Sequence, residues 1–197
     1  MLTEGSVEGV TITDVAVRAK VSRPLVYRLF PTRIALVRAV LDDFGEELSN
    51  AYRDVLVERL PGTLDALVEG FVEASCDLIE ARGAGPWRLL DGVSGDPELA
   101  PLGRTALRGV LAPWEQRLAD LTGRSLARSN SVLWVLVTAG RSALDGWIDG
   151  TMSRKEAVAD ASRAITALLL AFAEDPASAV LPPPDMRPVT PASRKRR

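Results

Sequence analysis

The chain has 197 residues, a formal net charge of −2 at pH 7 and 47% hydrophobic residues, which is enough apolar material for a real core. Histidine is absent and Cys76 is the one cysteine, so His-based catalysis, Ser-His or Cys-His nucleophiles, His or cysteine metal sites and an intrachain disulfide are excluded. We therefore expect no enzyme, no cofactor and no metal. Apolar runs such as 132–139 are far shorter than the ~18 residues that cross a membrane, and no leader is recognisable, so we expect a cytoplasmic protein.

The stretch 11–33 predicts two short helices separated by a tight turn. Thr11 is a good N-cap and Asp14 follows it at the capping-box spacing, after which apolar residues recur at helical spacing. The turn at Lys20-Val21 is too short to be a loop, and Ser22 is the next N-cap. Two short helices around such a turn form a helix-turn-helix.

Positive charge is concentrated in this stretch, although the whole chain is slightly acidic. Five basic residues and one acidic residue lie in it, and phosphate contacts need such a local excess. We expect the second helix to enter a major groove of double-stranded DNA with its outward residues at base edges. Leu25 and Leu29 either touch thymine methyl groups or contribute little to readout. The residues expected to contact DNA are Thr11, Ser22, Arg23, Pro24, Leu25, Tyr27, Arg28 and Arg33.

The segment AKVSRPLVYRLFPTR, preceded by TITDVA, resembles the DNA-binding domain of the tetracycline-repressor (TetR) family of bacterial regulators. The resemblance implies an all-α fold, in which a helix-turn-helix domain is followed by a helical-bundle ligand-binding and dimerisation domain. It further implies a ligand-responsive transcriptional repressor, dimeric on a palindromic operator. The alternative reading of the stretch is an ordinary helical hairpin whose arginines form a solvated face. The matching positions are Thr11, Val15-Ala16, Ala19, Val21-Ser22, Val26-Tyr27, Phe30 and Thr32-Arg33.

Three features depart from the family pattern, and one of them is Leu29, which stands where the family often has a polar residue. Lys20 stands where the family usually has glycine, and a left-handed turn there costs a non-glycine residue about 1 kcal/mol. Only ten residues precede Thr11, so the first helix of the family is expected to be truncated, with an exposed apolar face on Ile12, Val15 and Val26. Either the true start lies upstream, or DNA binding is weak or absent. The alternative function is then a helical dimeric ligand-binding or interaction protein that has lost DNA binding.

Apolar periodicity predicts further helices after residue 32. They are expected over 32–60, 63–82, about 86–92, 96–122, 125–149 and 153–175. A break is expected at Pro101 and a kink or boundary at Pro113, because an internal proline removes a hydrogen bond. We place the DNA-binding domain at 1–48, the ligand-binding and dimerisation domain at 49–175, and a disordered Pro-rich basic tail at 176–197.

The resemblance implies a small-molecule cavity in the second domain. Trp134 is the first choice for its wall, because it lies in the middle of a helix among Val and Leu residues. Inward charges are scarce, so a neutral or lipophilic effector is expected. Arg141 and Asp145, four residues apart, either orient a polar ligand group or form a surface ion pair of small value. The candidate ligand-binding residues, for each of which plain core packing is the alternative, are Phe71, Cys76, Trp87, Trp114 and Trp134.

The last two helices are expected to form the homodimer interface, since family members dimerise there. A dimer also places two recognition helices one DNA turn apart. Small residues on these helices permit close approach of a second subunit, although the two helices could equally bury each other. The expected interface residues are Ala139, Gly140, Ala143, Trp147, Ala164 and Leu168.

Overall fold

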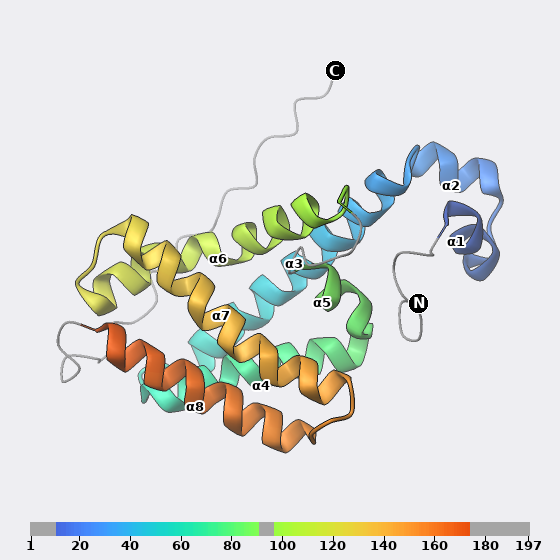
Figure 1. Ribbon diagram of the computed structural model, residues 1–197. Coiled ribbons are helices and arrows are strands. Elements are labelled where there is room, and N and C mark those ends of the chain that lie inside the picture. The colour runs from blue at the N-terminus through green and yellow to red at the C-terminus, as the bar shows by residue number, and fades with distance from the viewer. Residues whose placement is uncertain (1–10, 91–96, 174–197) are drawn as a thin grey trace.

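The computed structural model describes residues 11–90 and 97–173, except for the side chain of Leu121, and the regular structure in these two segments is entirely helical (Figure 1). This confirms the all-α prediction. The expected truncation of the first helix and the predicted tail at 176–197 fall outside the described residues. The helices are α1 (Ile12–Ala19), α2 (Arg23–Leu29), α3 (Arg33–Arg59), α4 (Leu64–Arg82), α5 (Ala84–Leu90), α6 (Ala100–Thr122), α7 (Leu126–Ile148) and α8 (Arg154–Phe172).

Side-chain caps set most of the helix starts. In α1, α3, α4, α7 and α8 the hydroxyl of the residue before the helix accepts a hydrogen bond from a backbone amide of the first turn. Thr11 with Asp14 and Ser153 with Glu156 form complete capping boxes, as their spacing predicts. Ser22 precedes α2 in extended conformation, but its side chain makes no cap hydrogen bond.

Helix α6 runs without interruption through both of its prolines, so the break expected at Pro101 and the helix boundary expected as one alternative at Pro113 are wrong. Pro101 lies in the first turn, where no amide donor is needed. Pro113 lies in the interior and leaves the carbonyl of Gly109, four residues earlier, without its helical partner. Gly109 and Pro113 are both exposed to solvent. Water can therefore satisfy this carbonyl, and the helix continues.

The two parts of the molecule share α3. In Figure 1, α1 and α2 lie at one end of α3, and α4, α5 and α6 pack against the rest of it. Helix α4 packs against α3 and against α8, and α8 packs along α7. The largest fully buried side chains of α3 are Leu41, Phe44 and Leu48. The boundary expected at residues 48 and 49 lies inside this continuous helix.

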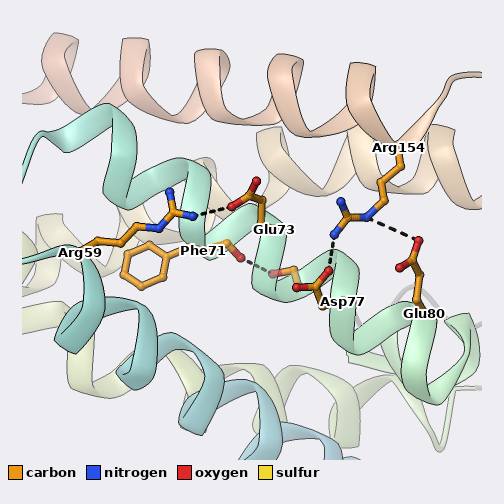
Figure 2. A network of polar contacts seen from close by, with 7 residues as sticks. Arg59, Phe71, Glu73, Asp77, Glu80 and Arg154 are labelled. Carbon is orange, nitrogen blue, oxygen red and sulfur yellow. Dashed lines mark hydrogen bonds and ion pairs between the residues drawn. The ribbon is translucent and has the colours of Figure 1, made fainter.

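Arginines hold α4 to the helices on either side of it (Figure 2). Arg59 of α3 pairs with Glu73 at 2.6 Å, and Arg154 in the first turn of α8 pairs with Asp77 and Glu80. Each of these five side chains is about one-third exposed or more, so each pair adds little free energy. Their effect is to fix the register of α4, which forms one wall of the cavity described below.

Candidate functional site

The turn between α1 and α2 is closed by backbone hydrogen bonds around a left-handed residue. Lys20 has φ 55° and ψ 37°, as expected for the position where a glycine is usual. The amide of Lys20 donates to the Val17 carbonyl oxygen at 3.2 Å, and the amide of Val21 donates to the Ala16 carbonyl oxygen at 3.1 Å. This 6→1 and 5→2 pattern ends a helix in one residue. It turns the chain directly into α2.

A small apolar cluster fixes α1 and α2 against each other and against α3. Ile12, Ala16 and Val26 are buried, and the half-buried Leu36 of α3 packs on them. The exposed apolar face expected on Ile12 and Val26 is therefore wrong, because these residues cover each other across the turn. The large apolar residues that this part of the chain does expose are Val17, Val21, Tyr27 and Leu29.

The outward side of the helix-turn-helix is basic. Asp14 is its acidic residue, and hydrogen bonds from the hydroxyl and the amide of Thr11 lower the pKa of this carboxyl. The hydroxyl of Thr11 is thus engaged in the capping box. Arg23 and Arg28 form no ion pair within the described part of the chain. Of the residues expected to contact DNA, Leu25 and Arg33 are half-buried, and the exposed ones are Thr11, Ser22, Arg23, Pro24, Tyr27 and Arg28.

A cavity of about 200 Å³ lies inside the helical bundle, with walls from α3 to α8. Its wall consists mainly of Leu, Val and aromatic side chains. Phe71, Trp87 and Trp114 line the cavity, whereas Cys76 and Trp134 do not. Cys76 is fully buried in the main core, where burial raises the pKa of its thiol to about 11, and Trp134 packs at the edge of that core. Helical spacing alone did not distinguish the core side of a helix from its cavity side.

Three aromatic rings in the cavity wall contact one another edge to face. The ring centroids of Tyr52 and Phe71 are 5.2 Å apart, and those of Phe71 and Trp114 are 4.9 Å apart. The Tyr52 hydroxyl lies 2.7 Å from the Ser75 oxygen, which donates to the Phe71 carbonyl oxygen. Burial raises the pKa of Tyr52, so its hydroxyl stays protonated at neutral pH. Tyr52 was not among the ligand-binding residues expected from the sequence, although it lines the cavity.

Two arginines, Arg117 and Arg141, also belong to the wall, so inward charges are few among the described residues but not absent. Only 10% of the Arg141 side chain is exposed, and its Nε lies 3.4 Å from Asp145. Because Arg141 is largely buried, the pair is not the surface ion pair that was one of the two alternatives. The signal was present in the sequence, because Val137 and Leu144 flank Arg141 at helical spacing and put it on the inward side of α7.

Helices α7 and α8 bury small residues against each other within one chain. A Cβ atom on Gly140 would lie 2.7 Å from Cδ1 of Ile165, so Gly140, expected at the dimer interface, packs against α8 of its own chain. The other expected interface residues are half-buried, namely Ala139, Ala143, Trp147, Ala164 and Leu168.

Residues 1–40 match the family model of bacterial regulatory proteins, tetR family. The match includes both helices of the basic helix-turn-helix and the first two turns of α3. The fold and this surface define a DNA-binding transcriptional regulator of the helix-turn-helix class. More narrowly, residues 1–40 are similar to the DNA-binding domain of bacterial regulatory proteins of the tetR family. No curated protein matches the chain significantly.

Two further properties concern residues 11–90 and 97–173. No helix in these segments is both long enough and apolar enough to cross a membrane. Within the same segments, no three His, Cys, Asp or Glu side chains are grouped so that they could hold a metal ion.

Proposed function

We propose that this regulator is a ligand-responsive repressor that binds a palindromic operator as a homodimer. The observation that carries the proposal is the double role of α3. Leu36, in its first turn, packs in the helix-turn-helix cluster, and Tyr52 and Leu56 near its other end line the cavity. A ligand that displaces Tyr52 or Leu56 acts on the helix that supports the DNA-binding surface. Its differential affinity for the two positions of α3 sets how far the equilibrium moves.

In this proposal α2 lies in the major groove. Arg23, Pro24 and Leu25 are at its N-terminal end, which reads base edges in helix-turn-helix proteins. Tyr27 and Arg28 follow on its exposed side and contact phosphates. Ser22 before α2, Thr11 before α1 and Arg33 at the start of α3 supply flanking backbone contacts.

The proposed dimer forms through α7 and α8, which lie next to each other in the bundle (Figure 1). Val135, Thr138 and Ser142 are exposed on α7 at helical spacing, and Ala167 and Leu170 are exposed on α8. The half-buried interface candidates lie beside this surface of small and aliphatic residues. A two-fold dimer repeats the contact symmetrically and presents two α2 helices to successive major grooves.

The effector is proposed to bind in the cavity against Phe71, Trp87 and Trp114. These aromatic residues come from α4, α5 and α6, so one ligand touches several helices at once. A mainly apolar wall with a few polar groups is the usual character of a small-molecule site.

The test is binding to duplex DNA from the region upstream of the coding sequence, beside unrelated DNA of equal length. Fluorescence anisotropy over a salt series should show selective binding, with two chains per duplex and affinity that falls steeply with salt. Equal affinity for both duplexes would contradict operator recognition. Binding of one chain per duplex would contradict the dimer.

A further inference from the structure

We propose that the cavity takes a small aromatic acid, whose ring packs against Tyr52, Phe71 and Trp114 and whose carboxylate pairs with Arg117. The inference rests on the proposed ligand response and names the chemical class of the effector. It replaces the neutral or lipophilic ligand expected from the sequence.

The size of the cavity and its rings favour an aromatic body. An apolar cavity of about 150 Å³ in another protein holds a benzene molecule, so about 200 Å³ suits a single ring with a short substituent. Aromatic groups prefer the edge-to-face arrangement already made by Tyr52, Phe71 and Trp114. A ligand ring can add to this arrangement without displacing a wall residue.

Arg117 favours an acidic group on that ring. It follows Trp114 by three residues on α6, so the two side chains are neighbours on one side of the helix, and both line the cavity. Arg117 is half-buried and has no hydrogen bond or ion pair within 11–90 and 97–173. A partly desolvated guanidinium without a counterion gains from a carboxylate, which it can bind through two parallel hydrogen bonds.

The acidic residues closest to Arg117 along α6 have other partners. Asp120 accepts a hydrogen bond from Gln116 at 2.7 Å, and Glu115 accepts one from Asn130 of α7. No Asp or Glu side chain contributes to the cavity wall among the described residues. The charged groups of the wall are therefore both cationic.

Arg141 is the less suitable partner for the ligand. Its guanidinium stacks on Trp87, donates to the Trp87 carbonyl oxygen at 2.7 Å and lies beside the Asp145 carboxylate. Its charge is thus balanced by the protein. The carboxylate is assigned to Arg117, and Arg141 is assigned to the attachment of α5 to α7.

Isothermal titration of the full chain with three matched probes tests the inference. Phenylacetate carries the ring and the acid, phenylacetamide lacks the charge, and cyclohexylacetate lacks the aromatic ring. We expect phenylacetate to bind on the order of tenfold more tightly than either. The preference for phenylacetate over phenylacetamide should disappear in Arg117→Gln and return in Arg117→Lys. The control is Arg108→Gln, which removes an exposed arginine of α6 outside the cavity wall and should keep the preference.

Several results would overturn the inference. They are equal binding of acid and amide, no binding of phenylacetate, equal binding of the cyclohexyl acid, or an acid preference that survives in Arg117→Gln. Operator affinity measured with and without phenylacetate separates this question from the proposed function. Saturation of the cavity with no change in operator affinity would leave the ligand class standing and contradict the ligand response.

Discussion

The guanidinium group of Arg141 lies over the indole ring of Trp87, 4.7 Å from the ring centroid, and donates a hydrogen bond to the carbonyl oxygen of the same residue. The indole N–H of Trp87 donates to Asp145 at 3.1 Å, one turn after Arg141 on α7. These contacts join α5 to α7 at one end of the cavity. Arg141 therefore has a structural role, because its contacts with Trp87 attach α5 to α7.

Replacement of Arg141 by Met should lower the free energy of unfolding by about 2 kcal/mol. The substitution removes a charged hydrogen bond and a cation–π contact from a mostly buried place. Urea denaturation followed by circular dichroism measures the effect. The control is Arg88→Met, which breaks the exposed pair with Asp149 and should cost less than about 1 kcal/mol. Equal losses would show that burial of Arg141 has no energetic weight.

Glycine-to-alanine changes should have opposite effects at two helical positions. A Cβ atom on Gly109 would meet nothing within 4 Å, so Gly109→Ala should stabilise by about 0.5–1 kcal/mol through helix propensity. A Cβ atom on Gly70 would lie 2.7 Å from Nε of Arg59 and from Cγ1 of Val55. Gly70→Ala should therefore destabilise, because the buried, β-branched side chain of Val55 has little freedom to move away from the new methyl group. Thermal unfolding of the two variants measures these effects. A higher melting temperature in both variants would contradict the close packing around Gly70 on α4.

The contact between Gly140 and Ile165 predicts a measurable coupling. Gly140→Ala alone should destabilise by about 1 kcal/mol, because the new methyl group overlaps Cδ1 of Ile165. In an Ile165→Val background the overlap is absent, and the same change should be neutral or stabilising. A double-mutant cycle from urea denaturation measures the difference. Sedimentation velocity should show the parent oligomeric state in every variant, and dissociation caused by Gly140→Ala would return this residue to the dimer interface.

Two arginines of α2 should affect DNA binding in different ways. Arg28→Gln, a proposed phosphate contact, should weaken binding to operator and unrelated DNA alike and reduce the salt slope by about 1. Arg23→Gln should cost about 1–3 kcal/mol on operator DNA and relax the preference at one base pair. Anisotropy with single-base operator variants separates the two. Arg53→Gln, about 30 Å along α3 from Arg33, serves as the charge-matched control. A uniform effect of Arg23→Gln on all sequences would make Arg23 a phosphate contact.

The capping box of α8 predicts an acid-dependent contribution to stability. Hydrogen bonds from the amide and the hydroxyl of Ser153 lower the pKa of Glu156 from its ordinary 4.5. A lowered pKa in the folded state means that the ionised carboxylate stabilises above pH 4.5 and that the benefit is lost as the pH falls through the folded value. The difference in stability between the parent and Glu156→Gln should thus be constant near neutral pH and shrink below about pH 4.5. Chemical denaturation of both proteins at several pH values above and below 4.5 tests this prediction. A stability difference that does not change with pH would show that the charge of Glu156 is not the cause.

The sequence was most informative where local chemistry decides the structure. Thr11, Thr63 and Ser153 mark helix starts because a hydroxyl before a helix satisfies a free amide wherever the helix packs. The helix-turn-helix was predictable for the same reason, since its turn and its caps lie within about twenty residues. Lys20 adopts the left-handed conformation that this spacing requires.

Tertiary packing decided what the sequence left open. Trp134 and Trp114 are both aromatic residues in long apolar helices, and only the arrangement of the neighbouring helices puts Trp114 in the cavity wall. Gly140 looked suited to a second subunit because spacing cannot say which helix approaches a small residue. Pro113 looked like a boundary because its tolerance depends on the exposure of Gly109, which is a property of the folded bundle.

Helix α3 has 27 residues and no break, so it is a rod about 40 Å long with no joint between the helix-turn-helix and the cavity. Such a rod converts a small rotation at one end into a larger displacement at the other. A tilt of about 5° about the cavity end carries its first turn through about 3.5 Å, as follows from the rise of an α-helix. That distance exceeds the length of a hydrogen bond. In the proposed ligand response, a slight rearrangement of the pocket would therefore suffice to move Arg33 and the helices before it out of register with a DNA backbone.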